Sequence, residues 1–248
     1  MTPYAEISSK YLTLADELLP DRVRGLYLTG SIPLGDFRPG RSDIDGVVVV
    51  DRPVTQDEVR PLHTGLPERP YFDVVYLTAP TLAAPPDLRA SVVCTIDGQL
   101  QAGGVSPVLW SELARQSIAV REVPGLKVHD DQQALVDYTR ANLTSYWAPL
   151  LDRVENRFAD APGDEVIDGW IIPWCVLGVP RLHALLAEGN IVSKTAAGEH
   201  GAATFPAYAG LCRRAIDHRA GTEVVFTAAD AIDAVAFGRT VIASAGEL

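Results

Sequence analysis

Apolar side chains recur at a helical spacing in the first segment of the chain, residues 3–19. Tyr4, Ile7, Tyr11, Ala15 and Leu18 belong to one stripe, and residues three or four positions apart lie on the same face of a helix. The pattern predicts an amphipathic opening helix whose apolar face packs onto a core.

Short apolar runs follow, rich in β-branched residues and bounded by glycine, proline or aspartate. They span residues 26–28, 47–50, 74–77, 92–95 and 118–120. Runs of this length and composition predict strands. Helical stretches are expected between some of them, near residues 56–63 and 107–116. The first half therefore predicts a mixed α/β layer whose sheet is twisted and partly parallel.

The pattern changes after Pro124-Gly125, where helical periodicity replaces the strand runs. It covers residues 130–158, 164–188, 207–219 and 227–244, and proline or glycine punctuates it at the spacing expected of helix ends. We therefore expect two domains. Residues 1–127 would form an α/β domain with a mixed sheet, and residues 128–248 an all-α helix bundle.

Composition indicates an ordinary globular protein, with 47% hydrophobic and 21% charged residues. The three cysteines, Cys94, Cys175 and Cys212, are far apart and odd in number, which predicts reduced, buried thiols. No run approaches the roughly 18 apolar residues of a membrane span, and the first residues do not resemble a secretion signal. A cytoplasmic protein without membrane contact is expected.

The formal net charge is −11. Nucleic-acid binding depends on clustered lysine and arginine that neutralise phosphates. The acidic balance therefore argues against nucleic acid as the main partner, and it permits a cationic small molecule.

Candidate chemistry is concentrated in residues 26–51, where an apolar strand is followed by Gly30-Ser31 and, later, by Asp43-Ile44-Asp45. Gly30 lets the backbone turn sharply and approach a ligand, and the hydroxyl and amide of Ser31 can donate to phosphate oxygens. Asp43 and Asp45 are two positions apart at the entrance to a strand, a spacing that places both carboxylates on one face. Carboxylate pairs of this kind bind Mg²⁺, which bridges phosphate groups.

A third carboxylate, Asp73, flanks the apolar run at residues 74–77. Two roles are open for it. It completes the metal site, or it accepts the proton of an attacking hydroxyl, which requires hydrogen-bond reach and a suitable pKa.

Other signatures are missing or incomplete. The sequence has no G-x-x-x-x-G-K, G-x-G-x-x-G, H-E-x-x-H or G-x-S-x-G motif, which argues against phosphate-loop ATPases, dinucleotide oxidoreductases, zincins and serine hydrolases. A calcium loop beginning at Asp43 is not expected, because Val47 stands where that loop needs an oxygen ligand.

The segment from Gly30 to Asp45, with Asp73 on a later strand, resembles the nucleotidyltransferase superfamily of the polymerase-β type. Residues 174–200, WCVLGVPRLHALLAEGNIVSKTAAGEH, look like the helical C-terminal domain of the adenylyltransferases that modify streptomycin and spectinomycin. The resemblance implies that Arg181 and Lys194 bind the triphosphate, that Mg²⁺ is the cofactor and that ATP is the co-substrate. Cationic groups suit this role because negative charge develops on the leaving pyrophosphate.

By this resemblance the chain is an adenylyltransferase that moves AMP from MgATP to a hydroxyl of a small acceptor, with a role in antibiotic resistance. An aminoglycoside or aminocyclitol is the expected acceptor. The antibiotic enzymes have polar and acidic residues where this chain has Trp170-Ile171-Ile172-Pro173-Trp174, so another metabolite or a protein stays open as the acceptor. The alternative from another class is a non-catalytic antitoxin or regulator with the same fold.

Overall fold

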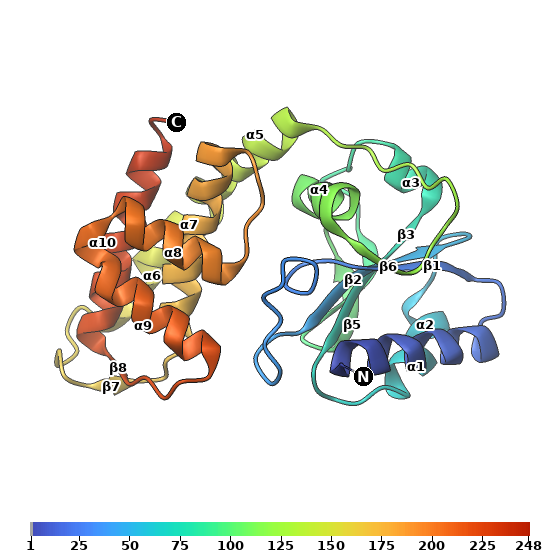
Figure 1. Cartoon of the computed structure of the whole chain (residues 1–248), viewed down its shortest axis with the longest axis horizontal. Coiled ribbons are helices and arrows are strands. Elements are labelled where there is room, and N and C mark those ends of the chain that lie inside the picture. The colour runs from blue at the N-terminus through green and yellow to red at the C-terminus, as the bar shows by residue number, and fades with distance from the viewer. Residues whose placement is uncertain (1) are drawn as a thin grey trace. The chain divides into compact units, whose positions relative to one another are not determined.

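The computed structural model describes residues 2–248 and divides into two compact units between Gln132 and Gln133. The sequence pattern placed the domain boundary at residue 127, shortly before this division. The first unit is a sheet with helices, and the second is largely helical (Figure 1). The predicted fold class, an α/β region followed by a helical one, is confirmed.

The first unit contains one six-stranded sheet in the order β5-β4-β3-β2-β1-β6. Strands β2 and β3 are parallel, and the other neighbours are antiparallel. The predicted opening helix and five predicted strands are present, whereas β5 and α3 were not predicted. The elements are α1 (Pro3–Leu18), β1 (Val23–Leu28), β2 (Ile44–Val50), α2 (Gln56–Thr64), β3 (Phe72–Thr78), α3 (Ala79–Ala83), β4 (Val92–Ile96), β5 (Gln99–Gly103), α4 (Pro107–Gln116) and β6 (Ile118–Arg121).

The central strands β1, β2 and β3 are largely buried on both faces. Successive side chains of a strand point to opposite faces, and helices cover each face of these strands. Leu26 and Leu28 of β1 belong to the cluster that α1 and α2 cover, and Tyr27 belongs to the cluster of α3 and α4 on the other face. These helix pairs lie on the two sides of the strands in Figure 1. Each buried aliphatic side chain contributes roughly 1.5–3 kcal/mol to the driving force for folding.

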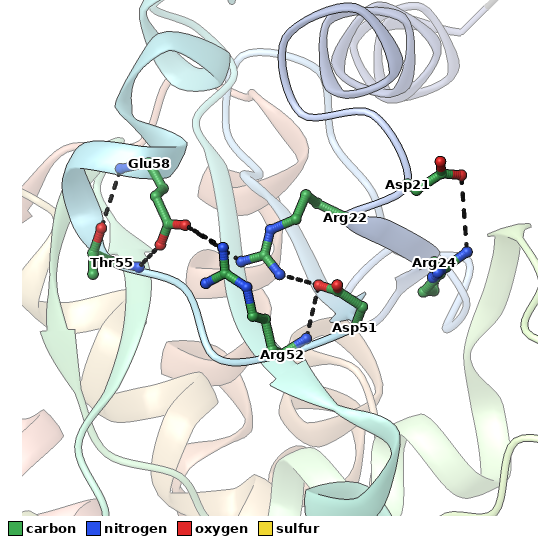
Figure 2. Close-up of polar contacts among 7 residues, drawn as sticks. All are labelled: Asp21, Arg22, Arg24, Asp51, Arg52, Thr55 and Glu58. Carbon is green, nitrogen blue, oxygen red and sulfur yellow. Dashed lines mark hydrogen bonds and ion pairs between the residues drawn. The ribbon is translucent and has the colours of Figure 1, made fainter.

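A network of charges joins the start of β1 to the end of β2 (Figure 2). Arg22 pairs with Asp51 and lies 3.5 Å from a carboxylate oxygen of Glu58. Glu58 also forms a capping box with Thr55 at the N-terminus of α2, in which the side chain of each residue accepts a hydrogen bond from the backbone N–H of the other. These contacts fix the C-terminal end of β2, whereas Asp43 precedes the N-terminal end of the strand.

The second unit packs its helices around one apolar core, which includes Trp147, Leu151, Val176 and Phe237. Helix α8 and the two short strands were not among the predicted elements. The elements are α5 (Gln132–Asn142), the π-helical turn η1 (Leu143–Trp147), α6 (Ala148–Phe158), β7 (Val166–Ile167), α7 (Ile171–Glu188), α8 (Lys194–Thr204), the 3-10 turn η2 (Pro206–Tyr208), α9 (Ala209–Ala220), β8 (Phe226–Thr227) and α10 (Ala228–Ala245).

Helix α7 is the central element of this core. Among the described helices it is the one whose length and composition would allow it to cross a membrane, but 61% of that segment is buried inside the protein. A helix buried in the core of a folded domain is also apolar on all sides, as a membrane-spanning helix is. Gly178 lets α7 approach Trp147, because a Cβ atom there would come within 2.1 Å of the indole.

Candidate active site

The topology of the first unit brings distant residues of the sequence to one edge of the sheet. Since β1 and β2 are antiparallel, the end of β1 lies beside the start of β2, with Leu28 opposite Gly46. Since β2 and β3 are parallel, their starts are adjacent, with Asp45 opposite Asp73. Gly30, which follows β1, therefore lies near the entrance to β2, and its neighbour there is Asp45.

Three carboxylates meet at this edge. Asp43, Asp73 and Asp97 each place an oxygen so that all three atoms lie within 4.8 Å of one another. Asp43 and Asp73 were predicted site residues, whereas Asp97 was not. Asp97 comes from the turn between β4 and β5, and the signal for it was the Asp97-Gly98 pair after an apolar run, which is typical of a hairpin turn.

The cluster of Asp43, Asp73 and Asp97 is called the acidic group, and Asp45 is not a member of it. Asp45 lies against Gly30, where a Cβ atom would come within 2.5 Å of Asp45 Oδ2. The structure therefore gives the two aspartates of the Asp43-Ile44-Asp45 segment different neighbours, although both lie at the entrance to β2. That Asp43 and Asp45 hold the metal together stays a prediction.

Asp73 is fixed by the β4–β5 turn. Its Oδ2 accepts a hydrogen bond from the backbone N–H of Asp97 and its Oδ1 one from the N–H of Gly98, both at 2.9 Å. Both turn residues have positive φ, 52° and 71°. Burial raises the pKa of Asp73, these hydrogen bonds oppose the shift, and the charges of Asp43 and Asp97 raise the pKa further. The balance favours a carboxylate that binds protons more readily than an ordinary aspartate.

Gly30 and Ser31 form a tight turn beside the acidic group. Gly30 has φ +62°, which glycine adopts without the penalty that other residues incur. The backbone carbonyl of Ser31 accepts a hydrogen bond from Asp36 at 2.9 Å. Its hydroxyl oxygen is buried and has no hydrogen-bond partner within residues 2–248. A buried hydroxyl of this kind is suited to donate to a ligand oxygen, since leaving it unpaired is costly.

The donor set fits a hard divalent cation. Mg²⁺ takes oxygen ligands and is usually held by one or two carboxylates together with substrate phosphates. Asp43, Asp73 and Asp97 supply carboxylate oxygens within mutual reach, an acidic triad typical of divalent-metal binding, and the Ser31 hydroxyl supplies a donor for a phosphate oxygen.

The other two predicted residues, Arg181 and Lys194, belong to the second unit. Arg181 contacts the connection between α7 and α8, and Lys194 follows that connection. Arg181, on α7, donates from Nε to the backbone carbonyl of Val192 at 3.0 Å. Lys194 is the first residue of α8, and its ammonium lies 5.0 Å from the centroid of the Trp174 ring. That these two cations bind the triphosphate stays a prediction.

Comparison with known proteins bears on this site. Residues 9–95, which include Gly30, Ser31, Asp43, Asp45 and Asp73, match the nucleotidyltransferase domain family. The first unit carries a nucleotidyltransferase domain. In the search of curated proteins, none matched the chain.

A solved structure shares the fold of this chain over 96% of its length. It is the spectinomycin adenyltransferase AAD(9) from Enterococcus faecialis with ATP and spectinomycin. The TM-score is 0.73 at 14% sequence identity, and the match covers 96% of this chain and 98% of the other. At this identity the likeness shows a common fold.

Proposed function

We propose that the protein transfers AMP from MgATP to a hydroxyl of a small acceptor and releases pyrophosphate. The acceptor class that we favour is an aminoglycoside or aminocyclitol, which would make the protein an antibiotic-modifying enzyme. The observation that carries the proposal is the carboxylate group of Asp43, Asp73 and Asp97 within a unit that carries a nucleotidyltransferase domain. The solved structure with ATP and spectinomycin supports the choice of nucleotide and acceptor.

The proposed reaction is a displacement at the α-phosphorus of ATP. The acceptor oxygen forms a bond to this phosphorus, the bond to the oxygen that bridges the α- and β-phosphates breaks, and pyrophosphate leaves with that electron pair. Asp73 accepts the proton of the acceptor hydroxyl, a role supported by its raised pKa. Magnesium, when bound, neutralises phosphate charge and orients the reacting groups.

The proposal also assigns binding roles to residues of both units. Asp43 and Asp45 hold the metal in the proposal, and the buried hydroxyl of Ser31 donates to a phosphate oxygen beside the Gly30 turn. Arg181 and Lys194 contact the departing pyrophosphate, whose developing charge a fixed cation stabilises. The last two assignments depend on the adenylyltransferase resemblance.

The test is an acceptor screen. Purified protein is incubated with ATP, Mg²⁺ and a panel of aminoglycosides, aminocyclitols and neutral sugars, and pyrophosphate release is followed together with the mass gain of one AMP group on the acceptor. Asp43→Asn and Asp45→Asn should each abolish turnover and leave circular dichroism unchanged, because each removes a charge that the metal neutralises. Binding of MgATP without transfer to any acceptor would favour the non-catalytic regulator instead.

A further inference from the structure

An arginine that the sequence motifs do not include lies beside the acidic group. Arg69, in the connection between α2 and β3, places its Nη1 atom 3.9 Å from Oδ1 of Asp43. The same guanidinium lies over the ring of Tyr71, with 3.7 Å from its central carbon to the ring centroid. Its Nη2 donates to the Tyr71 hydroxyl at 2.9 Å. Arg69 therefore stands next to a predicted metal ligand.

Tyr71 connects Arg69 to the backbone of the site. The carbonyl of Tyr71 accepts a hydrogen bond from the N–H of Ile44 at 2.8 Å, which ties it to the start of β2. Its ring packs on the β4–β5 turn, where a Cβ atom at Gly98 would come within 2.8 Å of the Tyr71 ring. Gly98 in turn donates to Asp73. The Tyr71 ring is thus a platform that holds the Arg69 guanidinium at the edge of the acidic group.

The charge of Arg69 suits two successive partners. In the ligand-free protein it offsets part of the repulsion among three aspartates. A divalent cation on Asp43 would remove the attraction that Arg69 has for this carboxylate. The Arg69 side chain is 69% exposed, so it can reorient without disturbing the core. Guanidinium groups match the oxygens of phosphates through paired hydrogen bonds.

We propose that Arg69 is a further nucleotide-binding residue, which pairs with Asp43 in the free protein and contacts the triphosphate when the acidic group holds a metal. This inference rests on the proposed function, because it uses the same nucleotide and the same metal. It places a cation for the phosphates in the first unit itself, in addition to Arg181 and Lys194 of the second.

Two binding measurements on the Arg69→Gln variant test the proposal, and they should change in opposite directions. Mn²⁺ alone, titrated by calorimetry, should bind about two- to fivefold more tightly, because an exposed ion pair no longer competes for Asp43. The α,β-methylene analogue of ATP, which cannot undergo transfer, should bind with Mg²⁺ at least about tenfold more weakly, because a charge-assisted contact is lost. A purely structural role for Arg69 would weaken both.

Arg60→Gln is the matched control, because Arg60 is also an exposed arginine of the first unit, and it pairs with Asp57 outside the acidic group. It should leave both affinities unchanged. Arg69→Lys keeps the charge and loses the planar contact with Tyr71, so it should preserve the metal affinity and weaken nucleotide binding. This variant decides the question if the glutamine variant does not fold.

Unchanged or weaker Mn²⁺ binding in Arg69→Gln would overturn the proposal, and so would unchanged binding of the nucleotide analogue. If the wild-type protein transfers AMP but the Arg69 variants bind as it does, this inference alone is wrong. If the wild-type protein binds no nucleotide at all, both the inference and the proposed function are wrong.

Discussion

Gly30 and Asp45 show how closely single residues are fitted at this site. Gly30 combines a positive φ of 62° with a position at which a Cβ atom would come within 2.5 Å of Asp45 Oδ2. Alanine at this position would have to displace the Asp45 carboxylate as well as adopt a left-handed backbone conformation, which costs roughly 1–2 kcal/mol. The function of Gly30 is therefore tied to the placement of Asp45.

The first prediction concerns this contact. Gly30→Ala should lower the rate of AMP transfer by about a hundredfold, the effect expected from a catalytic group that is misplaced by an ångström. Gly125→Ala is the control, since Gly125 has φ +69° and no atom lies within 4 Å of the position that its Cβ would take. Both variants should lose thermal stability because of the left-handed backbone conformation, while only Gly30→Ala also displaces Asp45 and loses activity. Equal activity in Gly30→Ala and Gly125→Ala would show that the placement of Asp45 does not matter for the reaction.

A second prediction concerns the role of Asp73. Asp73→Asn should lower kcat by roughly 10²–10⁴, the contribution of a general base, while the affinity for the MgATP analogue changes little. The ionised carboxylate is the active form, so the rate should rise with pH through a pKa above the ordinary aspartate value, as burial and the charge of Asp43 require. A large loss of Mn²⁺ affinity in this variant would instead make Asp73 a metal ligand.

At the scale of elements, most of the site could be predicted from the sequence, because its residues adjoin strongly apolar strands. The Gly30-Ser31 turn follows β1. Asp43 precedes β2, Asp45 is the second residue of β2, and Asp73 is the second residue of β3. Asp97 was missed because its place depends on the pairing of β3 with β4 and on β5. The sequence of β5, QLQAG, contains no β-branched or aromatic residue and is largely exposed at the sheet edge, so its signal for a strand is weak.

The contact of α1, α2 and β3 is predicted to depend on pH. Tyr11 donates to the Tyr76 hydroxyl at 2.9 Å, and Tyr76 lies 2.7 Å from Nε2 of His63. Burial lowers the pKa of His63 from 6.5 to about 4. The neutral imidazole is therefore favoured in the folded state, and its stabilising contribution is complete above pH 6.5 and is lost as the pH falls to about 4.

This prediction is checked by unfolding experiments. Between about pH 7 and about pH 4, the His63 contribution should lower the free energy of unfolding by roughly 2–3 kcal/mol. His63→Gln cannot titrate, so the difference in stability between this variant and the wild type should shrink as the pH falls. A difference that is constant with pH would show that His63 has an ordinary pKa in the folded protein.

For the whole molecule, the sequence pattern was sufficient for the class of each unit and insufficient for some of its elements. Helix α8, KTAAGEHGAAT, has small residues and little amphipathic character, so periodicity did not indicate it, and its Ala197, Gly198 and Gly201 are buried through close helix packing. The short strands β7 and β8 pair with each other, with Val166 opposite Thr227. Local sequence patterns do not encode a contact between residues so far apart in the chain.

The last prediction concerns the contribution of the second unit to nucleotide binding. Arg181→Ala and Lys194→Ala should each weaken binding of the MgATP analogue about ten- to a hundredfold, the range expected from losing one charge-assisted contact. At a saturating concentration, a tenfold weaker affinity lowers ligand-induced stabilisation by about 1.4 kcal/mol. The quantity to compare is the shift in melting temperature on adding ligand, because Arg181 also bonds to Val192 and its loss changes the unliganded protein.

Arg213→Ala provides the control, since Arg213 is an exposed arginine of α9 and its removal changes the net charge by the same amount. This variant should keep the full ligand-induced shift of the wild type. Trp174→Leu adds a test of how Lys194 is held, because its ammonium lies over the Trp174 ring, and a smaller loss of nucleotide affinity than in Lys194→Ala is expected. If Arg181→Ala and Lys194→Ala both retain the wild-type shift, the triphosphate is bound without these two residues, and the prediction that they bind it is wrong.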